Sequence, residues 1–344
     1  MSNGIIRVGL VGYGLAGSVF HAPLIRACPR LELTAILTTR EVPERVGSLE
    51  DLIEGSDLIV VASPNTSHFS IAKQALETGR HVVVDKPFTV TVEEADELIR
   101  IAAQQELVLS VFHNRRWDGD FLTVRELLPS LGVMMLFEAH WDRFRPAIKE
   151  GWRERPEPGS GVWNDLGPHM IDQALMLFGT PNAIQVDIFA QRRNALVDDY
   201  FDVTLHYGAL RVCLRSSSLV AAPRPRFSIH GSGGSFIKFG LDPQEAQLKA
   251  GIHPGDPGYG MDVEHGTLVR ADGSRGSVPT GRGNYLAYYE GIAATILDGA
   301  PVPVPARDAR DGLVLIDLAR RAASSGQRLS FPGASSTAAP VPQA

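Results

Sequence analysis

The sequence predicts an α/β protein in which a doubly wound parallel sheet is followed by an α+β domain with a large, mainly antiparallel, open-faced sheet. Over residues 1–117, short apolar runs alternate with helical patterns, as the strands and crossover helices of a parallel sheet do. Beyond residue 117, period-2 segments follow one another with few helices, which is typical of antiparallel strands. The length of 344 residues fits two domains, which we place at 1–117 and 118–331, and a Ser/Ala/Pro-rich tail at 332–344 is expected to be disordered.

Composition narrows the classes of protein that fit the chain. With 44% hydrophobic and 21% charged residues, the chain can bury a sizeable core. The net charge of −6 and the scattered Lys and Arg residues predict no nucleic-acid partner. No apolar run approaches the ~20 residues of a membrane helix, and the N-terminus lacks the pattern of a signal peptide, so we expect no membrane association and a cytoplasmic location. Cys28 and Cys213 have no partner at metal-ligand spacing, so no disulfide scaffold and no metal site are expected.

A glycine turn joins the first predicted strand, Ile5–Val11, to a predicted helix over Ser18–Ala27. The turn reads Gly12-x-Gly14-x-x-Gly17, and a strand before it with a helix after it is the context in which this motif binds a dinucleotide. The first glycine permits the tight turn, the second lets a pyrophosphate approach the backbone, and the third lets the helix pack on the strand. The N–H groups of the helix N-terminus then hold the phosphates. The candidate cofactor-binding residues here are Gly12, Tyr13, Gly14, Leu15 and Ala16.

The second predicted strand, Leu31–Leu37, ends where such domains select their cofactor, about 20 residues beyond the glycines. Thr38, Thr39 and Arg40 occupy this place instead of a carboxylate that would accept a ribose 2′-hydroxyl. Two hydroxyls and a guanidinium suit a 2′-phosphate, so NADP is predicted, with NAD as the alternative cofactor. The other interpretation makes Arg40 a solvated loop residue.

Two further buried strands are predicted to end at the same edge of the sheet, where ligands of open α/β sheets bind. Leu58–Ala62 follows a small helix near Leu49–Glu54 and leads into a helix over about Thr66–Leu76. Ser63, Pro64, Asn65 and His68 follow this strand and are expected beside the cofactor, although His68 is equally well explained as a helix-cap or packing residue.

The strand His81–Val84 ends in the charged pair Asp85 and Lys86, which precedes Pro87. Capping-box spacing at Thr91 then opens a helix to about Gln105. The next strand is expected over Leu107–Phe112, and Asn114 follows it at the cofactor edge.

The second half is predicted from alternation and turn residues. A helix that begins at Pro168 is expected to end at Gly179, and Leu241–Asn284 is expected to form a long irregular loop. The remaining predicted helices are Phe121–Leu128, Leu286–Leu297 and Asp308–Ala323, and the predicted strands are Met134–Trp141, Ala183–Ala190, Phe201–Tyr207, Arg211–Ser217, Arg226–His230 and Ser235–Phe239.

Oxidation of an alcohol by a nicotinamide cofactor needs a base for the hydroxyl proton and a group that supports charge on oxygen. Lys86 comes directly after a buried strand at the cofactor edge, which makes it a candidate, and a structural ion pair with Asp85 is the alternative. Asp165 and His169 are four residues apart near Pro168, so in a helix they face the same way. A position at the helix N-terminus would leave His169 neutral and able to accept a proton. The alternative is a cap for Asp165 and packing for His169.

The segment before this helix contains Trp152 and Arg153. Trp152 is a candidate for packing on a nicotinamide, and Arg153 is a candidate for binding phosphate or substrate. A hydrophobic anchor beside a surface ion pair explains both residues equally well.

Taken together, the glycine turn at 12–17, Asp85-Lys86-Pro87 and Asp165-x-x-x-His169 resemble the Gfo/Idh/MocA oxidoreductases over nearly the whole chain to about Phe331. Finer features resemble the NADP-dependent scyllo-inositol dehydrogenases of that family: Gly-Ser-Val-Phe-His at 17–21, Phe-His-Asn-Arg-Arg-Trp at 112–117, Gly-Trp-Arg-Glu at 151–154, Ser-Phe-Ile-Lys at 235–238 and Tyr-Leu-Ala-Tyr-Tyr at 285–289. Asp85 departs from the family, which usually has Glu there, and the segment between Arg40 and Leu49 is short.

The resemblance implies that Lys86 positions the substrate hydroxyl, that His169 is the acid/base and that Asp165 binds a neighbouring hydroxyl. It also implies cofactor contacts at Trp152 and Arg153 and at Thr39 and Arg40, a substrate contact at Tyr285, a cis bond before Pro87, and a homodimer or homotetramer formed through the C-terminal sheet.

The expected activity is reversible NADP-dependent oxidation of a secondary ring hydroxyl on a cyclic polyol such as scyllo-inositol. An aldose or keto-sugar is the alternative substrate. A sugar sensor without catalysis is the hypothesis from another class, and the loss of the lysine or of the Asp/His pair would be its mark.

Overall fold

The computed structural model describes residues 4–148, 151, 154–157 and 159–332, and its chain forms two compact units that we treat separately. Unit 1 comprises Met1–Asp118, Pro243–Met261 and Gly283–Leu313, and unit 2 comprises Gly119–Asp242, Asp262–Arg282 and Val314–Ala344. The sequence-based division assigned 118–331 to one domain, whereas two segments of that range, 243–261 and 283–313, fall in unit 1. The chain therefore crosses between the units several times.

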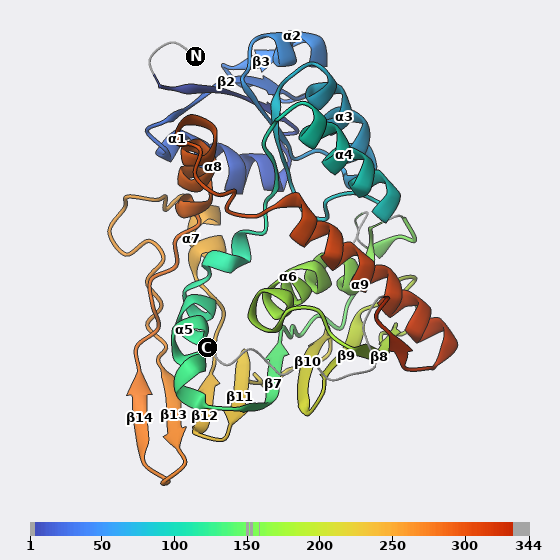
Figure 1. Ribbon diagram of the computed structural model, residues 1–344, viewed down its shortest axis with the longest axis vertical. Helices are drawn as coiled ribbons and strands as arrows, with labels where there is room; N and C mark the ends of the chain where they lie inside the picture. The colour runs from blue at the N-terminus through green and yellow to red at the C-terminus, as the bar shows by residue number, and fades with distance from the viewer. Residues whose placement is uncertain (1–3, 149–150, 152–153, 158, 333–344) are drawn as a thin grey trace. The chain divides into compact units, whose positions relative to one another are not determined.

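Unit 1 contains a six-stranded sheet in the order β3-β2-β1-β4-β5-β6, with every neighbouring pair parallel (Figure 1). This is the doubly wound parallel sheet that the sequence predicts. Its strands are β1 (Ile6–Val11), β2 (Leu31–Leu37), β3 (Arg45–Val46), β4 (Leu58–Val61), β5 (His81–Val84) and β6 (Leu109–Val111).

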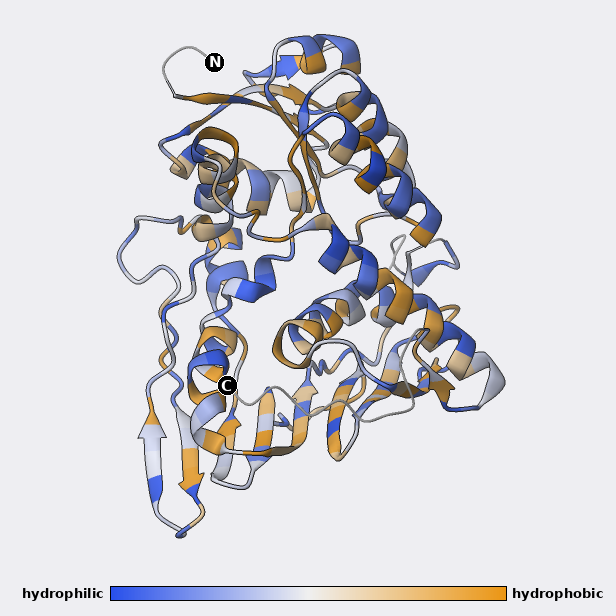
Figure 2. Ribbon diagram, viewed as in Figure 1, coloured by the Kyte–Doolittle hydropathy of each residue, from blue (hydrophilic) through white to orange (hydrophobic). Residues whose placement is uncertain are grey.

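The central strands of unit 1 are apolar on both faces because helices cover both faces of the sheet. In β4, Leu58 and Val60 belong to one hydrophobic cluster, while Ile59 and Val61 belong to another. Orange strands between helices with blue outer surfaces show the same arrangement in Figure 2. The helices are α1 (Ala22–Ala27, continuing a π-helical turn at Ala16–His21), α2 (Leu49–Glu54), α3 (His68–Glu77), α4 (Val92–Gln104), α7 (Gln244–Lys249) and α8 (Leu286–Asp298).

Unit 2 contains a nine-stranded sheet in the order β14-β13-β12-β11-β7-β10-β9-β8-β15. The pairs are antiparallel except that β7 and β10 are parallel. The strands are β7 (Met134–His140), β8 (Ala183–Phe189), β9 (Tyr200–Tyr207), β10 (Leu210–Ser217), β11 (Phe227–Gly231), β12 (Gly234–Lys238), β13 (Gly266–Arg270), β14 (Arg275–Val278) and β15 (Leu329–Ser330).

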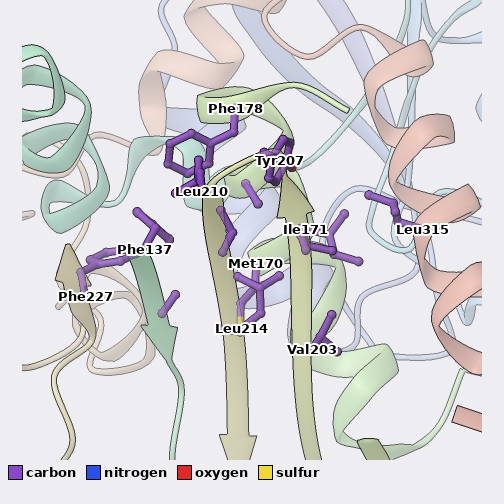
Figure 3. Close-up of a cluster of buried hydrophobic side chains, with 14 of the residues drawn as sticks. Phe137, Met170, Ile171, Phe178, Val203, Tyr207, Leu210, Leu214, Phe227 and Leu315 are labelled. Carbon is purple, nitrogen blue, oxygen red and sulfur yellow. The ribbon is translucent and has the colours of Figure 1, made fainter. Parts of the chain in front are cut away.

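One face of this sheet packs against helices, which are α5 (Gly119–Leu127), α6 (Gly161–Phe178) and the second half of α9 (Ala306–Ser325). Figure 3 shows the resulting core, in which side chains of α6 point toward those of neighbouring strands. The core residues labelled there are Phe137, Met170, Ile171, Phe178, Val203, Tyr207, Leu210, Leu214, Phe227 and Leu315. The period-2 alternation of strands such as β9 is thus explained by burial of one face.

The predicted start of the α6 helix is wrong. The helix begins at Gly161 and not at Pro168, which lies inside it. A carboxylate distant in the sequence starts the helix, because Asp198 accepts a hydrogen bond from the Trp163 N–H over 2.7 Å. A cap that comes from another segment leaves no local signal in the sequence.

The expectation of an irregular loop over 241–284 is also wrong, since α7, β13 and β14 form within it. Strands β13 and β14 extend the sheet edge by pairing with β12, and such pairing depends on a partner strand more than on local pattern. Within the described residues, no helix is both long enough and apolar enough to cross a membrane.

Candidate functional site

The glycine turn of unit 1 has the geometry that dinucleotide binding requires. Gly12 has a φ of +96°, and a Cβ there would lie 2.6 Å from the Ala62 carbonyl oxygen. At Gly17 a Cβ would lie 2.1 Å from the carbonyl oxygen of Gly12, so only glycine lets the helix approach the strand this closely. At Gly14 a Cβ would meet no atom within 4 Å. The backbone is therefore closed at the first and third glycines and open at the second, where a pyrophosphate would approach.

The segment that is predicted to select the cofactor, residues 38–40, directly follows β2. Thr38 is half-buried and its hydroxyl oxygen accepts a hydrogen bond from the Arg40 N–H over 3.1 Å. Thr39 and Arg40 are exposed. Glu41, which follows this segment, forms an ion pair with Arg45, with 2.5 Å between Oε1 and Nη1. The segment thus presents hydroxyls and a guanidinium, a donor set that fits a phosphate.

His68 connects two turns at the carboxyl ends of β4 and β5. Its side chain is 1% exposed. Nδ1 lies 2.9 Å from the carbonyl oxygen of Pro87, and Nε2 lies 3.0 Å from that of Ser63. The imidazole therefore holds the Ser63–Asn65 turn against the turn that carries Lys86. The interpretation of His68 as a cofactor contact stays a prediction, but its two ring nitrogens face backbone carbonyls of the protein.

Asp85 and Lys86 lie directly after β5, and the Lys86–Pro87 peptide bond is cis, as the family resemblance implies. Both residues are partly buried. Burial raises the pKa of Asp85, but hydrogen bonding by His21 and the charges of His21 and Lys86 outweigh burial, so the pKa of this carboxyl is below its usual range. An ionised carboxylate consequently stands beside the Lys86 ammonium.

His21 supports that carboxylate from the opposite side. It is fully buried at the end of the π-helical turn, with Nε2 3.7 Å from Oδ1 of Asp85 and Nδ1 2.6 Å from the Tyr289 hydroxyl oxygen. Burial raises the pKa of Tyr289 well above its usual value, so its hydroxyl keeps its proton. Residues 17–21 carry part of the family resemblance, but the sequence alone predicts no role for His21. Its place between the glycine turn and Asp85 appears only in the fold.

Asn114 and Tyr285 both lie in the interior of unit 1. Asn114 opens a short 3₁₀ turn after β6 and is 5% exposed. Tyr285 is fully buried, its hydroxyl donates to Oδ1 of Asp118 over 2.7 Å, and it accepts from Nη1 of Arg115 over 2.6 Å. The contacts expected for Asn114 with cofactor and for Tyr285 with substrate stay predictions.

Asp165 and His169 lie one turn apart in the interior of α6, in unit 2. Asp165 is partly buried and pairs with Arg143, whose Nη1 is 3.5 Å from Oδ2. His169 is 6% exposed, and its ring centroid lies 6.0 Å from that of Trp141, with 31° between the ring planes. Because α6 begins at Gly161, His169 lies beyond the first turn, where the effect of the helix dipole has faded. The prediction that the helix N-terminus keeps His169 neutral is therefore wrong.

Three buried residues around His169 were missed by sequence reasoning: Trp141, Gln173 and Arg226. Trp141 was expected only as the last residue of a strand, whereas it directly follows β7. Gln173 is one turn beyond His169 on the same helix face. Arg226 was expected only as the first residue of a strand. Trp152 and Arg153 lie outside the described residues, as does the tail from residue 333.

A doubly wound sheet with a dinucleotide-type glycine turn, joined to an α+β unit with an Asp/His pair, defines a class of nicotinamide-dependent oxidoreductases. Residues 6–113 match the NAD-binding Rossmann fold of the Gfo/Idh/MocA oxidoreductase family, and residues 125–331 match its C-terminal alpha/beta domain. The chain belongs to the Gfo/Idh/MocA family, and it is an NAD(P)-dependent dehydrogenase that acts on CH–OH donors.

Relatives match over most of their length. The chain is 46% identical over 328 residues to the uncharacterized oxidoreductase YdgJ of Escherichia coli, covering 91% of this chain and 95% of that protein. It is 40% identical over 331 residues to the scyllo-inositol 2-dehydrogenase (NADP(+)) IolW of Bacillus subtilis, covering 91% and 92%. A putative oxidoreductase of Yersinia pestis has a solved structure with a TM-score of 0.91 and 44% identity, covering 95% of this chain and 97% of that chain.

Proposed function

We propose that this enzyme transfers a hydride between NADP(H) and a secondary ring hydroxyl of a cyclic polyol, with scyllo-inositol as the preferred substrate. The observation that carries the proposal is the 40% identity, over 91% of the chain, with a relative named as an NADP-dependent scyllo-inositol 2-dehydrogenase. The neutral polyol also suits the candidate residues, since Lys86, Asp165 and His169 offer hydrogen-bonding groups to adjacent hydroxyls.

The proposed roles follow from the chemistry of each group. When bound, the nicotinamide cofactor supplies the acceptor for the hydride that leaves the hydroxyl-bearing carbon. The His169 imidazole accepts the hydroxyl proton, so that loss of hydride and proton together converts the alcohol to a ketone. Lys86 donates a hydrogen bond to the same oxygen and stabilises charge that develops on it. Asp165 accepts a hydrogen bond from a neighbouring hydroxyl and orients the ring.

Selection of NADP is assigned to the segment after β2. Thr38 and Thr39 provide hydroxyls, and the exposed Arg40 provides a planar guanidinium that can bind a 2′-phosphate through two hydrogen bonds. The glycine turn supports the pyrophosphate by its open approach at Gly14. NAD stays the alternative cofactor.

A sugar is the second candidate substrate, and a specific observation favours it. The chain is 33% identical over 208 residues to the UDP-N-acetylglucosamine 3-dehydrogenase of Acidithiobacillus ferrooxidans, covering 56% of this chain. That relative is named for oxidation of a ring hydroxyl on a sugar. An aldose or a keto-sugar would require the same acid/base chemistry.

The substrate proposal is tested by initial rates of NADP+ and NAD+ reduction with scyllo-inositol, myo-inositol and a panel of aldoses. We expect the highest kcat/KM with NADP+ and scyllo-inositol, and reduction of the corresponding inosose by NADPH in the reverse direction. A higher kcat/KM with an aldose than with scyllo-inositol would make the sugar, and not the polyol, the preferred substrate. If the enzyme turns over none of the inositols and none of the aldoses, both assignments are refuted.

We also propose that the enzyme forms a homodimer or homotetramer through the open face of its nine-stranded sheet. Apolar side chains are exposed near one end of this sheet, with Phe189 49% and Leu219 38% exposed in a shallow hollow that Tyr200 and Arg224 also line. Sedimentation analysis of the wild type and of Phe189→Glu tests this, because a charge on the contact face would dissociate the oligomer. A wild-type monomer would refute it.

A further inference from the structure

Arg226 is a buried cation that contacts two aromatic rings in unit 2. The residue directly precedes β11 and is 2% exposed. Its guanidinium carbon lies 4.9 Å from the ring centroid of Trp141 and 4.3 Å from that of Phe227. A planar guanidinium at these distances is attracted to the ring faces, and burial strengthens the attraction. Arg226 therefore restrains the position of the Trp141 indole.

The same indole packs against the imidazole of His169. The two ring centroids are 6.0 Å apart and the planes are 31° from parallel, while both side chains are nearly buried. A buried ring can change its rotamer only if its neighbours move. Restraint of Trp141 consequently limits the orientations open to His169.

Arg226 also reaches the helix that carries His169. Its Nη2 donates a hydrogen bond of 3.0 Å to Oε1 of Gln173, which is 1% exposed. Gln173 lies four residues after His169 in α6, so the two side chains share a face of the helix. The Arg226 guanidinium is thus linked to His169 in two ways, through the Trp141 ring and through Gln173 on the same helix.

Arg226 is itself held in place by a backbone hydrogen bond and by a buried carboxyl group. Its carbonyl oxygen accepts a hydrogen bond of 3.0 Å from the N–H of His140, the residue before Trp141. Its Nε lies 3.7 Å from Oδ2 of Asp120, a fully buried carboxyl whose Oδ1 accepts from the Phe121 N–H over 2.7 Å. These contacts fix both the chain and the side chain of Arg226 beside Trp141.

We propose that Arg226 is a positioning residue for His169, which it orients by holding Trp141 and Gln173 in place. The inference rests on the proposed role of His169 as the group that accepts the substrate proton. A proton acceptor must keep its nitrogen within hydrogen-bond distance of the hydroxyl, and a displacement of about 1 Å can lower the rate about 100-fold. Arg226 makes this contribution without itself touching the substrate.

The experiment compares Arg226→Met and Arg226→Lys with the wild type in two measurements. The first is the NMR signal of the His169 Cε1–H in protein labelled with ¹³C-histidine, assigned by its loss in His169→Gln. The Trp141 ring current displaces this signal, so we expect it to move in Arg226→Met toward the signal of the exposed His253. The second is steady-state kinetics, in which we expect kcat to fall about 100-fold in Arg226→Met with little change in KM.

Arg226→Lys separates positioning from folding. An ammonium keeps the charge and can still interact with the indole and bond to Gln173, so we expect partial recovery of both the NMR signal and kcat. If Arg226→Met does not fold, Arg226→Lys carries the test, with a His169 signal displaced from the wild-type position toward that of His253 and a kcat between those of the wild type and of His169→Gln. A His169 signal and a kcat that stay at wild-type values in the folded variants would overturn the proposal.

Lys238→Met is the matched control. Lys238 is another fully buried cation of unit 2, but its Nζ donates to Oδ2 of Asp262 over 2.8 Å and to the carbonyl of Phe239. We expect this variant to lose stability and to keep the His169 signal and kcat. Equal changes in Lys238→Met would show a general effect of buried charge and overturn the proposal. If the signal moves in Arg226→Met while His169→Ala keeps full turnover, the orientation of His169 by Arg226 holds and the proposed function fails.

Discussion

The candidate residues of the two units are held in place by different kinds of contact. In unit 1, Lys86 follows a strand that is hydrogen-bonded on both sides, and the imidazole of His68 joins its turn to a neighbouring turn through backbone carbonyls. In unit 2, His169 is held by the packing of Trp141 and, as proposed, by Arg226. Backbone geometry thus positions the first group, and side-chain packing positions the second.

This difference predicts different responses to mutation. A backbone-built site fails when a substitution alters close approach of the main chain, and the failure includes a loss of folding stability. A site whose residues are positioned by side-chain packing can lose activity while the fold persists, because only the rotamers of the packed side chains change.

His169→Ala and Lys86→Ala should each lower kcat strongly, by about 10³-fold for His169 as the proposed acid/base. Binding of NADPH should change little in both variants, which fluorescence titration of NADPH measures. If both residues act on one substrate, the double variant should lose much less than the product of the single losses. Near-wild-type turnover in either single variant would contradict the assigned roles.

Within the glycine turn, Gly17→Ala and Gly14→Ala should behave oppositely. The Cβ at Gly17 would lie 2.1 Å from a backbone oxygen, so we expect a loss of about 3 kcal/mol in the free energy of unfolding. At Gly14 the position is open, and stability should stay within about 0.5 kcal/mol of the wild type. Gly14→Ala should instead weaken NADPH binding about tenfold, which corresponds to about 1.4 kcal/mol, because a methyl group would occupy the approach of the pyrophosphate.

Denaturant unfolding and NADPH titration of the two glycine variants make this comparison. Unchanged NADPH affinity in a folded Gly14→Ala variant would place the pyrophosphate elsewhere. Equal destabilisation by both substitutions would contradict the distinction between a closed and an open glycine.

The same contrast explains what could be predicted from the sequence. Buried parallel strands such as β4 and β5 are continuous apolar runs, so their ends, and with them Ser63 and Lys86, were located correctly. The start of α6 was not located correctly, because Asp198 caps this helix from a distant segment of the chain. Arg226 and Trp141 became neighbours of His169 only through the pairing of β7 with β11, which no local pattern specifies. Strand ends could thus be predicted from the local sequence, whereas contacts between residues of paired strands could be identified only in the structure.

Asp120 provides a test of buried charge in unit 2. Burial raises the pKa of Asp120 from its ordinary 3.8 to about 6, against the opposing charge of Arg226. Between pH 3.8 and about pH 6, Asp120 is protonated in the folded state and ionised in the unfolded state. The stabilisation that comes from this bound proton is therefore complete below about pH 4 and is lost as the pH rises through 6. The wild type should therefore gain up to about 3 kcal/mol relative to Asp120→Asn between pH 7 and pH 4. Denaturant unfolding across this range measures the difference, and parallel pH curves would contradict it.

The smallest expected effect concerns the segment of unit 1 that we propose selects the cofactor, in which Thr39 and Arg40 are exposed. Arg40→Ala should lower kcat/KM for NADP+ about tenfold and leave the value for NAD+ nearly unchanged, because one hydrogen-bonded guanidinium at an exposed phosphate contributes at the lower end of about 1.5–3 kcal/mol. The matched control is Arg7→Ala, which removes another exposed arginine of unit 1, one that pairs with Asp57. If Arg7→Ala changes the NADP+/NAD+ ratio as much as Arg40→Ala does, the effect is one of the net charge of unit 1. An unchanged ratio in Arg40→Ala would remove Arg40 from cofactor selection and leave Thr38 and Thr39 as the groups to test next.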